Sequence, residues 1–196
     1  MPSRQDKARI FIVSGPSGSG KTTLLKRLQS RKLFRRTIAK IITVTTRPMR
    51  RGERQGRDYR FVGRKEFLRR KHRRDFIESK EIFGEYYAVP KPDLLKALNK
   101  GLDVFLCIDV RGAFCIRRLF PGNSVLIFIA PPDIKSLRER LRLRSTEEKT
   151  ALASRLKVAK KEMGRIEDYD YIIINNRLRE ALQQLSAIII AERLRA

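Results

Sequence analysis

Residues 8–23 read ARIFIVSGPSGSGKTT, an apolar run that stops at a glycine-rich turn and continues into a basic segment. The β-branched and aromatic residues of 8–14 are typical of a buried strand. After the turn, Leu24, Leu25 and Leu28 recur at the spacing of one helix face, with cations on the opposite face. This stretch therefore predicts a strand, a tight loop and a helix in direct succession.

The loop fills every required position of the phosphate-binding pattern G-x-x-x-x-G-K-[ST] (the P-loop), from Gly15 to Thr22. Its glycines let backbone N–H groups face phosphate oxygens, and the following helix N-terminus adds partial positive charge. We expect Lys21 to neutralise charge on the terminal phosphates of a nucleoside triphosphate and Thr22 to ligate Mg²⁺. The residues predicted to bind the triphosphate are Gly15, Pro16, Ser17, Gly18, Ser19, Gly20, Lys21, Thr22 and Thr23.

Short apolar runs of the same kind follow at 38–44, 104–110, 125–129 and 171–174, and helical stretches separate several of them. This alternation predicts an α/β fold with a mostly parallel sheet and helices on both faces. In such folds ligands bind beyond the carboxyl ends of the strands. The P-loop lies at one of these ends.

Two regions depart from the alternation. Residues 45–90 are polar and rich in arginine, with weaker strand signals at 58–62 and 85–89, and we interpret them as an insert. Near the C-terminus, helical stretches at 133–143 and 150–163 flank the charged sequence RLRSTEEK. This pattern suggests a hinged lid.

The chain carries 46 Lys and Arg against 21 Asp and Glu, a formal net charge of +25. An anionic partner is expected, and the candidates are nucleotides, nucleic acid or an acidic membrane surface. Residues 47–74 alone hold thirteen Lys and Arg against three Asp and Glu. No separate nucleic-acid motif accompanies them, so the charge indicates non-specific polyanion binding at most.

The remaining composition excludes several classes of protein. None of the apolar stretches reaches the roughly 18 to 20 residues that span a bilayer, so we expect no membrane protein. Residues 1–9 are polar and lack a small-residue cleavage site, which favours a cytoplasmic location. Cys107 and Cys115 form no CxxC pair, so two reduced thiols are expected rather than a disulfide framework or a zinc site.

Five further segments begin at residues 45, 76, 105, 128 and 169 and read TTRPMRRGERQGRDYRFV, FIESKEIFGEYYAVP, FLCIDVRGA, FIAPPDIKSLRERLRLR and YDYIIINNRL. Together with the P-loop they make the chain similar to the guanylate kinase family, collinearly from about residue 10 to 195. The resemblance implies transfer of the γ-phosphoryl group of ATP to GMP in purine nucleotide metabolism, with Mg²⁺. It also implies a three-layer α/β/α P-loop core, a small mixed α/β nucleotide-binding insert and a helical lid.

The resemblance further implies boundaries and residue roles. The core would comprise 1–44, 91–137 and 157–196, the insert 45–90 and the lid 138–156. The GMP phosphate would be bound by Arg47, Arg50, Tyr59 and Tyr87, and guanine by Thr43 and Glu78. Asp109, at the end of a core strand, would ligate Mg²⁺ and contact the substrate. Asn175 would lie near the adenine of ATP. The catalytic residues would be Lys21, Arg47 and the lid arginines Arg140, Arg144 and Arg155.

The chemistry of these residue types fits phosphoryl transfer, which needs charge neutralisation around the moving group rather than a nucleophilic side chain. Arg47 and Arg50 lie three residues apart in a loop that Pro48 stiffens, so both guanidinium groups can converge on one phosphate. Guanine presents two donors on one edge, N1–H and the 2-amino group. The Glu78 carboxylate can accept both, whereas adenine lacks this pair.

The sequence also departs from the family pattern. Ala88 and Val89 stand where the family usually has glycine followed by serine or threonine, and Cys107 replaces a common acidic residue. A hydroxyl and a carboxylate that would contact guanine are therefore missing, while the phosphate-binding residues are retained. We expect phosphoryl transfer from ATP with weakened binding of GMP.

Three alternatives stay open on the sequence. A related P-loop kinase could use a shifted acceptor, which turnover with other nucleoside monophosphates would reveal. A non-catalytic guanylate-kinase-like interaction module would leave the complete P-loop and the lid arginines without a purpose. A nucleic-acid binder would use the basic surface. The sequence predicts GMP as the substrate, with dGMP as a second acceptor, and a monomer or simple homodimer.

Overall fold

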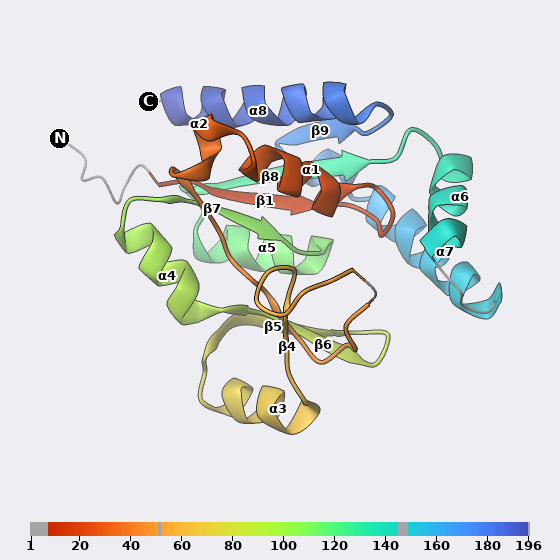
Figure 1. The fold of residues 1–196 in the computed structure, drawn as a ribbon, viewed down its shortest axis with the longest axis horizontal. Coiled ribbons are helices and arrows are strands. Elements are labelled where there is room, and N and C mark those ends of the chain that lie inside the picture. Colours follow the sequence, from red (N-terminus) through yellow and green to blue (C-terminus); the bar gives the residue numbers. More distant parts are fainter. Residues whose placement is uncertain (1–7, 51, 145–148, 196) are drawn as a thin grey trace.

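The computed structural model describes residues 8–50, 52–144 and 149–195 of the chain. Its core is a five-stranded sheet in the order β2-β7-β1-β8-β9, and every neighbouring pair is parallel (Figure 1). The strands are β2 (Ile38–Lys40), β7 (Asp103–Cys107), β1 (Ile10–Ser14), β8 (Ser124–Ala130) and β9 (Tyr171–Ile174). β1 and β8 are buried along their whole length, as expected for a sheet covered on both faces.

Helices cover the two faces of this sheet. On one face α1 (Lys21–Gln29), α2 (Lys32–Arg35) and α8 (Leu178–Leu194) pack over a cluster in which the Phe11 and Phe105 rings stack at 5.5 Å. On the other face lie α4 (Lys91–Asn99) and α5 (Val110–Leu119). Each fully buried large apolar side chain stabilises the fold by about 1.5–3 kcal/mol. The predicted three-layer α/β/α core is confirmed.

A second sheet of four strands lies beside the core, in the order β4-β3-β6-β5 (Figure 1). It contains β4 (Arg60–Phe61), β3 (Val44–Thr45), β6 (Glu85–Pro90) and β5 (Phe76–Ile82), and it is mixed because only the β3–β4 pair is parallel. Helix α3 (Arg64–His72) covers it through Phe67, whose ring lies 4.8 Å from Phe76 and 5.2 Å from Tyr86. This small sheet and α3 form a mixed α/β unit, as expected for the insert, and its first strand begins at Val44.

The apolar run 38–44, expected as one strand, is divided between the two sheets. Residues 38–40 pair with β7 in the core, while Val44 pairs with β4 and β6. The backbone changes partners in between: the N–H of Ile41 still donates to Phe105, whereas the carbonyl of Thr43 accepts from Arg60. The chain therefore passes from one sheet to the other within three residues, which places Thr43 at their junction.

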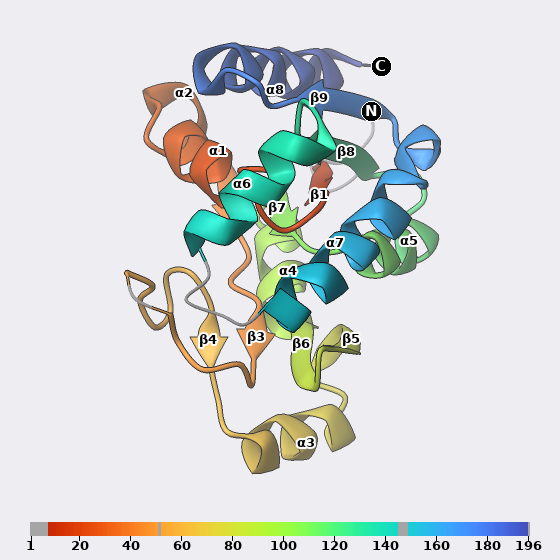
Figure 2. The ribbon, with the colours of Figure 1, turned by 90° about the vertical axis from the view of Figure 1, so that its right-hand side faces the viewer.

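Helices α6 (Ile134–Arg144) and α7 (Lys149–Met163) stand at the end of the core toward which β1 and β8 point (Figures 1 and 2). They pack on each other through Leu137, Leu141 and Ala159. A short 3-10 turn, η1 (Ile166–Asp168), leads from α7 to β9. None of the helices in the described ranges is long and apolar enough to cross a membrane.

Candidate nucleotide-binding site

The P-loop connects β1 to α1 in a conformation that requires its glycines. Gly15, Gly18 and Gly20 have φ angles of 133°, 91° and 91°, a region that side-chain-bearing residues rarely adopt. A Cβ on Gly15 would also collide with the carbonyl oxygen of Ile129, and one on Gly20 with the amide of Asn175. Substitution at either glycine would therefore force the loop away from β8 or β9.

The Lys21 ammonium folds back over this loop and donates to the carbonyl oxygens of Gly15 at 2.6 Å and Pro16 at 2.9 Å. The first turn of α1 begins after Gly20, and within the described part of the chain no side chain caps it. Its backbone N–H groups are those that a helix leaves for an external acceptor. The loop therefore presents one ammonium and a helix N-terminus to the same region, an arrangement suited to phosphate.

Asn175 supports the loop from behind. It is 5% exposed at the end of β9, and its side-chain amide donates to the carbonyl of Ser19 at 2.7 Å. The backbone carbonyl of Asn175 accepts from the Arg140 guanidinium at 3.1 Å. These contacts link the P-loop to β9 and to helix α6, so Arg140 lies next to the P-loop. An adenine contact by Asn175 stays a prediction.

The predicted acceptor-phosphate residues come together on the second sheet. The Arg47 guanidinium carbon lies 5.4 Å from the centroid of the Tyr59 ring, and the Tyr59 ring lies 6.2 Å from that of Tyr87. Burial raises the pKa of the Tyr59 hydroxyl well above its usual range, so this group remains a neutral donor. Arg50 is exposed at the edge of the group. Arg47, Tyr59 and Tyr87 therefore form one group, and Arg50 lies three residues after Arg47 in the adjoining loop.

Glu53, which the sequence reasoning did not single out, organises this group. Its carboxylate accepts two bonds from the Arg47 guanidinium, at 2.8 and 3.0 Å, and one from the Arg50 backbone N–H at 2.8 Å. Burial opposes the charge of Arg47, but the contacts with Glu53 outweigh it and raise the pKa of Arg47 above its usual value. Glu53 is therefore a positioning residue for both arginines.

Three charged side chains meet where β5 faces the start of α5. The Glu78 side chain is 6% exposed, and burial raises the pKa of its carboxyl although Lys80 opposes the shift. The Lys80 ammonium contacts Asp109 Oδ1 and lies 3.9 Å from Glu78 Oε1. Asp109 also caps α5 by accepting from the Gly112 N–H at 2.9 Å. Thr43, at the sheet junction, is 8% exposed.

Helix α7 adds a carboxylate that the sequence reasoning missed. Burial, with a further contribution from Asp109, raises the pKa of Glu162 to about 7, although Lys21 and Lys80 oppose the shift. Glu162 therefore lies within electrostatic range of both the P-loop lysine and the β5 lysine. Together with Lys80 and Asp109 it lines a hollow of about 320 Å³ between β5, α5 and α7.

The other expected residues are placed less completely. Arg155 is half-buried on α7. Arg144 ends α6, but its side chain lies outside the described residues, as does the stretch 145–148. Burial raises the pKa of the Cys107 thiol, at the carboxyl end of β7, so this side chain is a neutral neighbour of the site.

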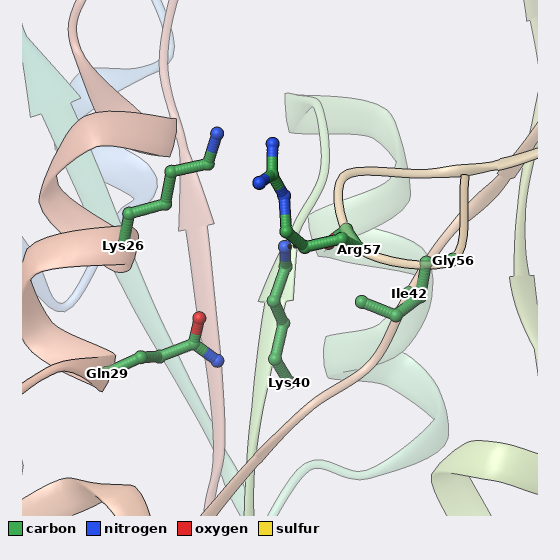
Figure 3. A pocket seen from close by; sticks show the side chains of 6 residues that line it. All are labelled: Lys26, Gln29, Lys40, Ile42, Gly56 and Arg57. Atoms are coloured by element: carbon green, nitrogen blue, oxygen red, sulfur yellow. Dashed lines mark hydrogen bonds between the residues drawn. The ribbon is translucent and has the colours of Figure 1, made fainter. Parts of the chain in front are cut away.

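A second hollow, of about 480 Å³, lies between α1 and the loop that precedes β4 (Figure 3). Its lining includes Lys26, Lys40 and Arg57, whose side chains extend toward the same space. Behind them Asp58, whose side chain is 3% exposed, pairs with Lys26 at 2.7 Å and with Arg57 at 2.7 Å. This network ties a core helix to the second sheet.

The comparisons with known proteins agree with this geometry. A family model described as guanylate kinase matches residues 7–192. A guanylate kinase of Anaplasma phagocytophilum is 39% identical over 95% of this chain and 88% of its own length, and one of Buchnera aphidicola is 41% identical over 94% and 88%. A crystal structure of guanylate kinase from Anaplasma phagocytophilum superposes with a TM-score of 0.78, at 35% identity, over 96% of this chain and 88% of that one.

Proposed function

The chain belongs to the guanylate kinase family. We propose that its P-loop binds ATP and that its second sheet binds GMP. It transfers the γ-phosphoryl group of ATP to GMP, giving ADP and GDP. The observation that supports GMP as the acceptor is the buried carboxylate of Glu78, because a carboxylate can accept both N1–H and the 2-amino group of guanine.

On the donor side, residues 15–23 bind the phosphates of ATP through backbone N–H groups, and Lys21 supplies the positive charge. When ATP binds, the Lys21 ammonium exchanges the carbonyls of Gly15 and Pro16 for phosphate oxygens. Asn175 keeps the loop in place through Ser19. We propose that it also contacts the adenine of ATP. The loop thus needs little reorganisation at the moment of transfer.

The residues proposed for Mg²⁺ are Thr22 and Asp109. The Thr22 side chain is exposed on the first turn of α1, at the position where its hydroxyl can reach a cation bound to the phosphates. Among the described residues no group of three or more His, Cys, Asp or Glu could hold a metal ion. The Thr22 hydroxyl and the Asp109 carboxylate nevertheless fit Mg²⁺, because this ion keeps several waters and phosphate oxygens as its other ligands. When bound, Mg²⁺ neutralises charge on the phosphate oxygens.

On the acceptor side, Arg47 and Arg50 bind the GMP phosphate with the hydroxyls of Tyr59 and Tyr87. Thr43 and Glu78 bind guanine, and dGMP serves as a second acceptor because none of these contacts involves the 2′-hydroxyl. Glu53 holds Arg47 in place before the phosphate arrives. The phosphate contacts therefore orient the attacking oxygen, whereas Glu78 selects the base.

We assign residues 45–90 to the acceptor-binding insert and 138–156 to the lid. The arginines Arg140, Arg144 and Arg155 stabilise the charge of the transferring group from the lid side. Arg140 is supported in this role by its contact with Asn175 beside the P-loop. Closure of insert and lid over the two nucleotides excludes the water that would otherwise accept the phosphoryl group.

The test is a coupled assay with ATP and Mg²⁺ on the wild-type protein and on Lys21→Ala. Electrostatic groups of this kind contribute on the order of 3 kcal/mol to the barrier, so turnover with GMP should fall at least 100-fold while the fold survives. Lys65→Ala, an exposed lysine on α3, is the matched control and should keep wild-type turnover. Near-wild-type turnover in folded Lys21→Ala would contradict the assignment.

A second role follows from the charge alone. The net charge of +25 supports non-specific binding of polyanions such as nucleic acid, which nucleotide turnover does not require. A cytosolic location and a monomer or simple homodimer stay predictions, as does a part in purine nucleotide metabolism.

A further inference from the structure

Lys80 occupies a position that the reaction as described above does not use. It follows Glu78 by two residues on β5, so both side chains project from the same face of the strand. Its side chain is 13% exposed, and its ammonium contacts Asp109 and lies 3.9 Å from Glu78 Oε1. A buried lysine held between two carboxylates has a defined position rather than a solvated one.

The surroundings of this ammonium leave little room for an alternative arrangement. The backbone of Gly112 lies directly against it: a Cβ at that residue would stand 2.6 Å from Lys80 Nζ and 3.1 Å from Glu78 Oε1. Asp109 is itself fixed because it caps α5. The Lys80 ammonium is thus held in a fixed position beside the Glu78 carboxylate, which is proposed to bind guanine.

An ammonium has three N–H donors and no acceptor. One donor is directed to Asp109, and the 3.9 Å separation from Glu78 is an ion pair rather than a hydrogen bond. In the described part of the chain the Lys80 ammonium makes no other hydrogen bond, so two donors are available to a ligand beside Glu78. On guanine, the atom next to the N1–H that a carboxylate accepts is the 6-oxo oxygen, an acceptor without a protein donor in the arrangement described so far.

We propose that Lys80 is a specificity-determining residue that donates a hydrogen bond to the 6-oxo group of the purine acceptor. This inference rests on the proposed function of Glu78 as the guanine-binding carboxylate and adds a second contact on the same edge. Glu78 then selects the 2-amino group, and Lys80 selects the 6-oxo group. A 6-amino group, as on AMP, would place donors against a buried cation and would be rejected.

The proposal is tested with three acceptors that change one group at a time. GMP carries both recognition groups, IMP lacks the 2-amino group, and 6-thio-GMP keeps N1–H and the 2-amino group but replaces the 6-oxo oxygen by sulfur, a weak acceptor. kcat and KM are measured for each acceptor with the wild-type protein, Lys80→Met and Glu78→Gln. Lys65→Met, on the exposed face of α3, is the matched charge control.

A hydrogen bond from a charged donor corresponds to roughly a 10- to 100-fold change in affinity. The wild-type protein should therefore prefer GMP to 6-thio-GMP by about tenfold or more in kcat/KM. Lys80→Met should abolish this preference, mainly through KM for GMP, and leave the ratio of GMP to IMP unchanged. Glu78→Gln should reduce the ratio of GMP to IMP, and Lys65→Met should behave as the wild type.

The outcomes separate the inference from the proposed function. An equal loss with GMP and 6-thio-GMP in Lys80→Met would show that Lys80 acts only through charge or packing, and would overturn the inference. An unchanged ratio of GMP to IMP in Glu78→Gln would instead overturn the assignment of Glu78. Should Lys80→Met fail to fold, the kcat/KM ratio of GMP to 6-thio-GMP in the wild-type protein still tests the inference. Equal use of the two acceptors would contradict a hydrogen-bond donor at the 6-oxo group.

Discussion

The ammonium of Lys26 on α1 and the carboxylate of Asp58 in the loop before β4 form an ion pair at 2.7 Å that connects the core to the second sheet. The Asp58 side chain is 3% exposed and also accepts from the Arg57 guanidinium and the Arg54 backbone N–H. The core helix α1 and the second sheet are therefore joined through a buried carboxylate. Such a contact is costly to break, because it would leave a charge without its partners.

This network predicts a pH-dependent contribution to stability. Burial alone would raise the pKa of Asp58, but its hydrogen bonds with Lys26, Arg57 and Arg54 lower it from 3.8 to about 2. A lowered pKa in the folded state means that the stabilisation, about 2 kcal/mol, is present above pH 4 and is lost as the pH falls toward 2. Asp58→Asn should thus unfold about 2 kcal/mol more easily in urea at pH 7.

The matched control is Asp93→Asn, which removes the more exposed ion pair with Arg60. Pairs of this kind contribute about 0–1 kcal/mol, so its unfolding free energy should stay near that of the wild type. Equal stability of the wild type and Asp58→Asn at pH 7, or a difference that does not shrink below pH 4, would contradict the role of Asp58.

Glu53→Gln should weaken GMP binding although Glu53 itself binds no substrate. Without the carboxylate, Arg47 loses the two bonds that fix its guanidinium, and the loop around Arg50 loses a backbone anchor. We expect KM for GMP to rise about tenfold, since charge-assisted bonds contribute about 1.5–3 kcal/mol, while KM for ATP changes little. Glu66→Gln on α3, which pairs only with its helix neighbour Arg69 among the described residues, is the control. A rise in KM for ATP of the same size would argue for a general loss of fold.

Restoring polar groups at two positions should improve GMP binding. Val89 lies directly across from Glu78 in the pairing of β5 with β6, so a threonine hydroxyl there would adjoin the base-reading carboxylate. A carboxylate at position 107 would lie near Lys21 and Lys40, which already oppose the raised pKa of the Cys107 thiol. The double variant Val89→Thr, Cys107→Asp should lower KM for GMP by about tenfold or more.

The expected gain concerns binding and not chemistry, so kcat should change little in this double variant. Val89 is fully buried and Cys107 is partly buried, so the unfolding midpoint is to be measured alongside to separate a loss of stability from a loss of affinity. An unchanged or higher KM in a protein that remains folded at the assay temperature would show that these positions do not contact guanine.

The basic surface should bind polyanions in a salt-dependent manner. Thirteen cations against three acidic residues in 47–74 would release counterions from a phosphate backbone, so affinity should fall steeply with added salt and depend little on base sequence. Fluorescence anisotropy with mixed-sequence DNA and RNA at several salt concentrations measures this. Undetectable binding at low salt would mean that the surface is merely solvated.

The sequence was sufficient for the features encoded in short segments. The P-loop could be predicted because its pattern requires contiguous residues, and the strand before it and helix after it were confirmed. The run 38–44 misled, since apolar periodicity does not reveal that the backbone changes partners between Ile41 and Thr43. Local pattern thus predicted the elements but not the junction between the two sheets.

The site was predicted only in part for a similar reason. Arg47, Tyr59 and Tyr87 come together as expected. Glu53 was missed because its role comes from the bonds that it accepts from Arg47 within one loop. Glu162 was missed because it interacts electrostatically with Lys21 and Lys80, which are remote from it in the sequence.

Lys80 could have been found from the two-residue period of a strand, which places it beside Glu78. Its contact with Asp109, 29 residues away, required the fold. Sequence alone does not bring β5 against the start of α5.

The central claim, that this protein phosphorylates GMP and selects it through Glu78, is tested most directly by kcat/KM for GMP, dGMP, IMP and AMP in the wild type and in Glu78→Gln. The account predicts that GMP is the best acceptor of the wild type, that dGMP is also used, and that Glu78→Gln reduces the preference for GMP over IMP and AMP. Because Arg47, Arg50, Tyr59 and Tyr87 are untouched, kcat should change less than KM. A wild-type preference for AMP, or use of GMP that is indifferent to Glu78, would contradict the claim.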